Sequence, residues 1–134
     1  MLAQQEIRSD EVPAPAYQFS QGVRKGSMIQ VSGQGGVAPG FAADAPENNL
    51  AAQTIRALDN VGKVLEAGGS SYEDAVMVRL YLTTRDHFAE VCDLYDAYIA
   101  ERVSGVLPAR TTVIVELPGP TMLIEVDALA AVAS

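Results

Sequence analysis

Glycine and proline residues divide this sequence into segments whose hydrophobic patterns each fit one strand or one helix. The predicted order is strand, strand, helix, strand, helix, strand, strand. The strands are expected at Tyr17–Arg24, Met28–Ser32, Ala75–Leu82, Thr111–Leu117 and Thr121–Ala130, and the helices between residues 48 and 67 and after residue 86. This order predicts an α+β domain in which both helices pack on one face of a mixed sheet.

The first helix has an apolar stripe at helical spacing and recognisable signals at both ends. Asn48 or Asn49 is expected to cap its start, and Gly68-Gly69 to end it after Ala67. Asp86 is the expected cap of the second helix. The predicted stripes are Leu50, Ile55, Leu58, Val61 and Leu65 in the first helix, and Phe88, Val91, Tyr95, Tyr98 and Ile99 in the second.

The strand at residues 75–82 has two faces of different character. Val76, Val78, Leu80 and Leu82 alternate with Met77, Arg79 and Tyr81. Because the second face also carries apolar residues, we expect this side of the sheet to pack against another subunit.

The remaining segments are expected to be turns, loops and a terminal arm. Residues 1–16 are polar and contain two prolines, which predicts a loosely held N-terminal arm before a single domain at residues 17–134. Lys25-Gly26-Ser27 predicts a hairpin turn, and Pro118-Gly119-Pro120 a turn that joins the last two strands. The segment Gly33–Glu47 is rich in glycine and proline and predicts a long loop, a kind of segment that is often functional.

Composition excludes several classes of protein. The 134 residues carry a formal net charge of −8 with only nine Lys and Arg, so RNA or DNA is not the expected partner. The single cysteine rules out an intramolecular disulfide.

Residues 1–15 lack the apolar core of a signal peptide, and no apolar run approaches the roughly 20 residues of a membrane span. We therefore expect a cytoplasmic protein. With 49% hydrophobic residues and a mean hydropathy of +0.12, it is also expected to bury apolar surface between subunits.

Two charged residues near the C-terminus are the main candidates for chemistry. Arg110 follows Pro108-Ala109 at the start of an apolar strand, and a guanidinium can hold a carboxylate through two parallel hydrogen bonds. Its spacing alone favours an ordinary surface arginine. Glu125 lies among apolar residues in the last strand. Two interpretations of Glu125 are open. Either it is an ordinary exposed carboxylate, or it is buried against another subunit and needs a partner such as Arg79, a water or a substrate. Together, Arg110 and Glu125 indicate a small pocket for an anionic metabolite.

Other polar residues carry weaker signals. Gly33-Gln34-Gly35-Gly36 could offer backbone N–H groups to an anion, but it lacks the residues of a nucleotide-binding loop. His87 is expected to be solvated, and Cys92 to be a packed thiol. One histidine and one cysteine make a zinc site improbable, so no metal is expected.

Several segments, taken in order, resemble one family. They are Phe19-Ser20-Gln21-Gly22-Val23, Val31-Ser32-Gly33-Gln34, Gln53-Thr54, Leu58-Asp59-Asn60-Val61, Leu65-Glu66-Ala67-Gly68-Gly69, Val78-Arg79-Leu80-Tyr81-Leu82-Thr83, Pro108-Ala109-Arg110-Thr111 and Ile124-Glu125-Val126. In order and spacing, the chain resembles the RidA/YjgF family of reactive enamine and imine deaminases from Phe19 to Ala130.

This resemblance implies a fold, an assembly and an activity. The implied fold is chorismate-mutase-like (YjgF-like), and the implied assembly is a homotrimer with sites in the clefts between subunits. The implied reaction is hydrolysis of 2-imino or 2-enamino acids to 2-keto acids and ammonia without a cofactor. Arg110 matches the arginine that binds the substrate carboxylate, Glu125 the acid that helps to hold the attacking water, and Gly33 the loop glycine whose backbone lines the pocket.

The chain also departs from the family pattern. Phe19 stands where the archetypal deaminases have a tyrosine, and Tyr17, expected on the same strand face, could compensate. Cys92 replaces a common asparagine, whereas Thr112 keeps a hydroxyl beside Arg110 and is expected to help Glu125 hold the water. Phe19, Tyr17, Gly33 and Gln34 complete the expected substrate-binding set.

Because the family also has members without known deaminase activity, the alternative function is a non-catalytic trimeric module that binds small carboxylates. Ribonuclease activity, proposed for relatives, is the least favoured because of the negative charge and the absence of a His/Lys catalytic cluster.

Overall fold

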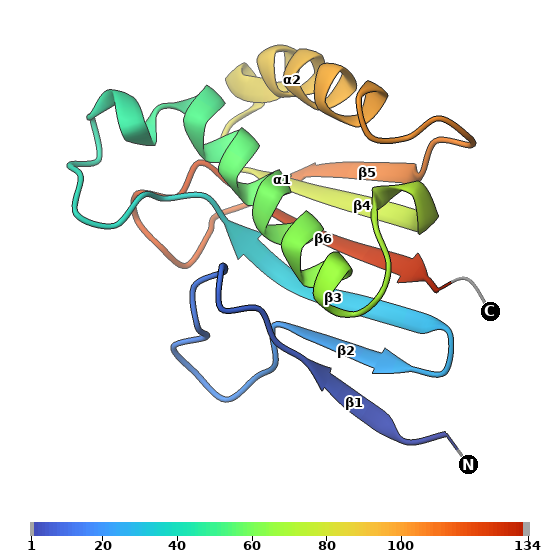
Figure 1. Ribbon diagram of the computed structural model, residues 1–134. Helices are drawn as coiled ribbons and strands as arrows, with labels where there is room; N and C mark the ends of the chain where they lie inside the picture. Colours follow the sequence, from blue (N-terminus) through green and yellow to red (C-terminus); the bar gives the residue numbers. More distant parts are fainter. Residues whose placement is uncertain (1, 133–134) are drawn as a thin grey trace.

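The computed structural model describes residues 2–132, and within them six strands form one sheet with two helices on the same side of it (Figure 1). The strands, in the order β1-β2-β3-β6-β4-β5 across the sheet, are antiparallel except for the parallel pair β4–β5. Their bounds are β1 Gln4–Ile7, β2 Gly22–Lys25, β3 Met28–Gly35, β4 Ala75–Leu82, β5 Ala109–Ile114 and β6 Ile124–Ala131. The predicted α+β architecture with a mixed sheet and both helices on one face is confirmed.

The helices are α1 at Leu50–Ala67 and α2 at Phe88–Ala100. Short 3₁₀ turns, η1 Pro46–Asn48, η2 Tyr72–Asp74 and η3 Arg85–His87, precede α1, β4 and α2. The Asn49 side chain accepts a hydrogen bond from the backbone N–H of Ala52, so the predicted cap of the first helix is confirmed. The Asp86 cap is wrong, because the Thr84 side chain instead accepts from the Asp86 N–H at the start of η3.

The core lies between the sheet and α1, with α2 covering its far end (Figure 1). Most of the predicted apolar faces are buried there. Three predicted core residues are exposed: Val76, because the register of β4 against β6 shifts between Ala75 and Met77, and Ile55 and Phe88, which lie at the margins of their helical stripes. The exposed fraction of Val76 is 55%.

The N-terminal region differs from its prediction. Gln4–Ile7, expected to lie in a loosely held arm, pairs with β2 as an edge strand, and Ile7 and Val12 are buried. The predicted strand Tyr17–Arg24 is reduced to Gly22–Lys25, since residues 17–21 are irregular. Strand β3 also extends beyond Ser32 to Gly35, and the loop that was expected from Gly33 begins after it.

The last two strands are shorter than predicted and are not neighbours. Strand β5 begins two residues earlier than expected and pairs with one side of β4, while β6 pairs with the other side. Hence the turn at Pro118-Gly119-Pro120 joins strands on either side of β4. A hydrophobic alternation identifies a strand and its faces, but it does not identify the neighbouring strand.

Candidate active site

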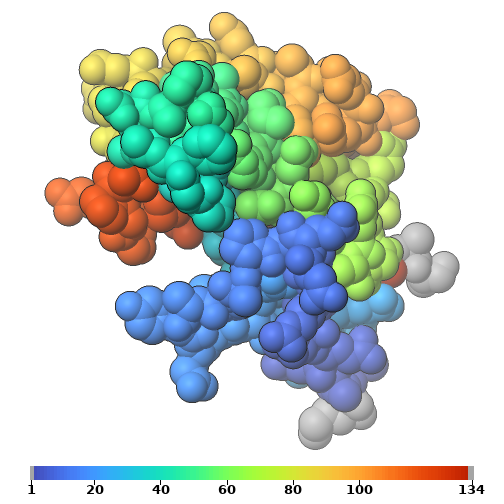
Figure 2. Space-filling view, turned by 60° about the vertical axis from the view of Figure 1, so that its left-hand side comes forward, coloured from blue at the N-terminus to red at the C-terminus, as the bar shows by residue number. Residues whose placement is uncertain are grey.

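Glu125 lies beside a cavity of about 740 Å³ at the end of β3. Gly33, Gly35 and Phe19 are among the residues that line it. Figure 2 shows the molecular surface hollowed between the blue N-terminal segment and the orange-red segment that precedes β6. The cavity brings together four of the predicted site residues, Glu125, Gly33, Gln34 and Phe19.

The contact between Glu125 and Gly33 is close. A Cβ atom at residue 33 would lie 2.5 Å from Oε1 of Glu125, so only glycine leaves this carboxylate in its observed place. Burial, and then the neighbouring carboxylate of Asp127, raise the pKa of Glu125 above its ordinary value. A carboxylate with a raised pKa is better suited to accept and return a proton near neutral pH.

Polar side chains of α1 hold the loops around the cavity. The Asn60 amide donates to the carbonyl of Gly35 at 3.0 Å, and the guanidinium of Arg56 donates to the carbonyl of Gly36. Gln53 is fully buried; its amide donates to the Thr121 carbonyl at 3.1 Å and accepts from the Leu123 N–H at 2.9 Å. These three residues were missed as a group, although their i, i+3, i+7 spacing inside an apolar stripe is a readable signal.

Gln21 performs the same task for the N-terminal side of the cavity. Its side-chain amide donates to the carbonyls of Val12 and Pro13 and accepts from the N–H of Ser9 at 2.7 Å. This buried amide therefore fixes the segment that leads to Phe19. Tyr17 is 83% exposed and does not line the cavity that contains Glu125. The strand face that Tyr17 was expected to share with Phe19 does not form, because residues 17–21 are irregular.

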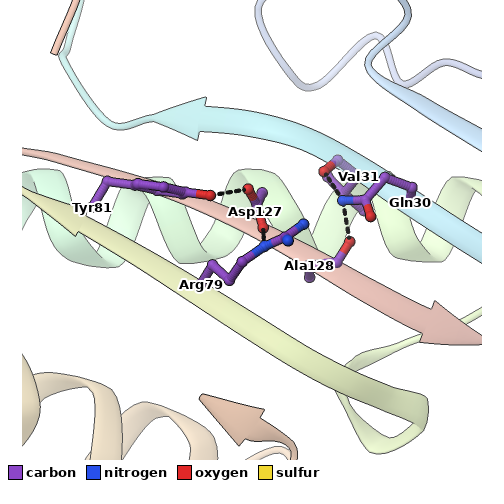
Figure 3. Close-up of polar contacts among 6 residues, drawn as sticks. All are labelled: Gln30, Val31, Arg79, Tyr81, Asp127 and Ala128. Atoms are coloured by element: carbon purple, nitrogen blue, oxygen red, sulfur yellow. Dashed lines mark hydrogen bonds and ion pairs between the residues drawn. The ribbon is translucent and has the colours of Figure 1, made fainter. Parts of the chain in front are cut away.

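The sheet face opposite the helices carries a separate polar cluster (Figure 3). The Arg79 Nε donates to Asp127 at 2.6 Å, and the Tyr81 hydroxyl donates to the same carboxylate at 2.7 Å. The predicted alternative pair between Arg79 and Glu125 is therefore wrong, because Asp127 is the partner of Arg79. Glu125 lies two residues from Asp127 along β6 and shares its face.

Arg110 lies elsewhere, on the helix-facing side of β5. Its Nη2 donates to the sulfur of Cys92 at 3.4 Å, its Nη1 lies 3.9 Å from a carboxylate oxygen of Asp96, and its guanidinium carbon lies 5.1 Å from the ring centre of Tyr95. Cys92 was predicted to be a packed thiol, and it is half-buried in contact with this guanidinium. Thr112 lies on the same face, and its hydroxyl is buried without a hydrogen-bond partner among the described residues.

One chain does not bring Arg110 and Glu125 into one site. Arg110 is opposite Val78, which is buried under the helices, whereas Glu125 is opposite Tyr81, whose side chain is on the other face. Because side chains alternate between faces, the two functional groups project from opposite sides of the sheet. A site that uses both therefore requires two copies of the chain.

The described residues offer no obvious metal site and no membrane segment. Between residues 2 and 132, no three His, Cys, Asp or Glu side chains gather in a way that could hold a metal ion. In the same part of the chain, neither helix combines the length and apolar character needed to cross a bilayer.

Comparison with known proteins identifies the fold and the family. The crystal structure of the YjgF gene product from Escherichia coli matches with a TM-score of 0.83 and 34% identity, covering 95% of this chain and 98% of that one. The 2-iminobutanoate/2-iminopropanoate deaminase of Escherichia coli (strain K12) is 34% identical over 92% of this chain and 94% of that protein. A RutC family protein of Saccharolobus solfataricus is 35% identical over the same shares of the two chains.

The fold is thus that of the YjgF proteins. The model of the Endoribonuclease L-PSP family matches residues 9–132, nearly the whole chain. The protein belongs to this family, the RidA/YjgF family that its sequence motifs indicate.

Proposed function

We propose that this protein hydrolyses 2-imino and 2-enamino acids to 2-keto acids and ammonia. The observation that carries the proposal is the carboxylate of Glu125 lying against the Gly33 backbone in a cavity large enough for a small metabolite. Deaminase names among relatives about one third identical support the same reaction. The proposal needs no cofactor, and it places the protein in the cytoplasm without a nucleic-acid or membrane partner.

The proposed site forms between two copies of the chain. Arg110 of one copy binds the substrate carboxylate, and Glu125 of another copy faces the imine carbon. The support for this arrangement is that the two side chains project from opposite faces of one sheet. A homotrimer, as the family resemblance implies, would supply such a pair at each interface.

Hydrolysis then requires little more than positioning and proton transfer. Glu125 takes a proton from water, whose oxygen bonds to the imine carbon while the nitrogen is protonated. The resulting carbinolamine is protonated again on nitrogen, and the C–N bond breaks with its electron pair leaving on ammonia. Loss of the hydroxyl proton gives the 2-keto acid. Because imines already hydrolyse spontaneously in water, a modest gain from orientation and general base catalysis is sufficient.

Thr112, Gln34, Phe19 and Tyr17 have supporting roles in this proposal. The unpartnered hydroxyl of Thr112 is available to hold the attacking water once neighbouring side chains shift to admit substrate. Phe19 and the backbone near Gln34 shape the apolar end of the cavity. Tyr17 is exposed in the single chain, so its contact with substrate depends on the neighbouring copy.

Substitution of Arg110 tests the proposal directly. Arg110→Ala should raise KM for 2-iminopropanoate, generated in the assay, by roughly tenfold or more, because a charge-assisted contact to the carboxylate is lost. Arg85→Ala, at an exposed position, removes the same charge and should leave the rate unchanged. The spontaneous rate is subtracted in each case. Wild-type kinetics in the folded Arg110→Ala protein would reject the assignment.

The same assay separates the alternative function, a non-catalytic module that binds small carboxylates. Phe19, which lines the cavity without a hydroxyl where the archetypal deaminases have a tyrosine, favours this alternative. Binding of 2-oxobutanoate that depends on Arg110, with no hydrolysis above the spontaneous rate, would establish the binding module in place of the enzyme.

A further inference from the structure

Helix α2 already occupies the hydrogen-bonding edge of the Arg110 side chain. Nη2 donates to Cys92, Nη1 lies near the Asp96 carboxylate, and the guanidinium carbon lies over the Tyr95 ring. Only 27% of the Arg110 side chain is exposed. Both terminal nitrogens therefore have neighbours from this helix before any ligand arrives.

A ligand carboxylate that binds end-on would need these same two nitrogens. A bidentate pair uses two parallel N–H groups of the guanidinium fork, so a ligand must displace or share the contacts made by α2. The thiol of Cys92 is a weak acceptor, and the Tyr95 ring, over which the guanidinium carbon lies, offers no oxygen acceptor from its π face, so neither competes strongly with a charged oxygen. Asp96 is different, because it offers the same chemical group as the ligand.

We propose that Asp96 is an internal competitor for Arg110 and thereby sets the affinity of the site for carboxylate ligands. This inference rests on the proposed function, in which Arg110 is the carboxylate clamp. Asp96 opposes ligand binding in two ways: its charge offsets part of the guanidinium charge, and it repels the incoming anion.

The geometry fits a competitor better than a fixed support. The Nη1–Oδ1 separation of 3.9 Å is too long for a hydrogen bond, and the Asp96 side chain is 72% exposed. Such a carboxylate can rotate away into water when a ligand arrives, at a small cost. Because Asp96 holds Arg110 only weakly, the guanidinium remains available to a ligand, whereas a tight buried ion pair would block ligand binding.

Binding of 2-oxobutanoate to the full-length protein, measured by titration calorimetry at low salt, tests the inference. Asp96→Asn should bind roughly two- to five-fold more tightly than the wild type, the range that an exposed ion pair allows. The matched control is Asp93→Asn, which removes the same charge from an exposed position three residues earlier on α2 and should bind as the wild type does. Near 1 M salt the gain should shrink, because exposed charges are then screened over about 3 Å.

The outcomes separate this inference from the function on which it rests. Suppose that Arg110→Ala loses binding, while Asp96→Asn binds as tightly as the wild type or more weakly. Asp96 is then not a competitor, but Arg110 is still the residue that binds the carboxylate. Equal gains in Asp96→Asn and Asp93→Asn would also overturn the inference, since they would reflect net charge alone. If Arg110→Ala binds as well as the wild type, or if the wild type binds no keto acid, then Arg110 does not bind the ligand carboxylate. The proposed function is then rejected together with the inference about Asp96.

Discussion

At the scale of single residues, Glu125 shows how the cavity changes the chemistry of a side chain. Burial, reinforced by Asp127, raises its pKa, which means that the folded chain disfavours its charged form. The ordinary pKa of a Glu side chain, which applies to Glu125 in the unfolded chain, is 4.5. Above that pH, Glu125 loses its proton more readily in the unfolded chain than in the folded one. Stability therefore falls as pH rises through the window up to the raised folded pKa, and the penalty stays constant above it.

This environment predicts opposite effects of Glu125→Gln on stability and on turnover. The neutral amide avoids the burial penalty, so the variant should be more stable than the wild type at pH 7. The difference should shrink toward pH 4, where Glu125 is mostly protonated in both states. Turnover should nevertheless fall more than ligand affinity, since the amide cannot accept a proton. Urea unfolding at the two pH values measures the first effect, with Glu116→Gln at an exposed position as the charge control. A stability gain that is the same at both pH values would contradict the proposed cause.

At the scale of elements, the sequence predicts α1 and β4 to within a residue or two at each end. Asn49 and Gly68 mark the ends of α1 by local backbone chemistry, and strict alternation marks β4. The register shift that exposes Val76 carries no such local signal, since it depends on the pairing with β6. The placement of β5 and β6 on either side of β4 likewise depends on contacts distant in sequence.

The candidate site shows the same division between local and distant information. The motif order groups Glu125, Gly33 and Phe19, and all three line one cavity. It does not reveal that Asp127 pairs with Arg79, or that Arg110 contacts Cys92 and Asp96 on α2. Those pairings follow from the sheet register and from how α2 lies over β5, and neither is encoded by any one segment.

The connection that leads from α2 to β5 is fixed by one carboxylate on η2. Glu73 accepts hydrogen bonds from the Ser104 N–H at 2.9 Å, the Ser104 hydroxyl at 2.8 Å and the Gly105 N–H at 3.0 Å. The Ser104 backbone contact, foremost among these, lowers the pKa of Glu73. The contact is therefore fully present above the ordinary carboxyl pKa, and it weakens as pH falls through the lowered value.

Glu73→Ala should loosen this connection without unfolding the domain. The amides of Ser104 and Gly105 lose their acceptor, so their hydrogen exchange at neutral pH should become faster, while amides in β4 and α1 should be unaffected. Glu66→Ala, at an exposed position on α1, is the control for loss of a carboxylate. Unchanged exchange at residues 104 and 105 would show that the backbone holds this segment without Glu73.

At the scale of the whole molecule, the two faces of the sheet divide the proposed chemistry between copies of the chain. Arg110 and Thr112 lie on the helix-facing side, and Glu125 lies on the other. The open face also carries the Arg79–Asp127–Tyr81 cluster, beside half-buried apolar residues that a neighbouring copy could cover (Figure 3). Activity should therefore belong to the assembly and not to a single folded chain.

Mixing two impaired variants tests this division of the site between copies. Arg110→Ala and Glu125→Gln chains, unfolded together in equal amounts and refolded into mixed oligomers, should show higher activity at low substrate concentration than either variant refolded alone. In a cyclic assembly, a complete site needs Arg110 from a Glu125→Gln chain and Glu125 from an adjacent Arg110→Ala chain, so about one quarter of the wild-type sites should be intact. Each variant refolded alone is the control for residual activity, and refolded wild type is the control for yield. If the mixture is no more active than its parents, Arg110 and Glu125 do not meet across an interface, because random assembly would otherwise have produced complete sites.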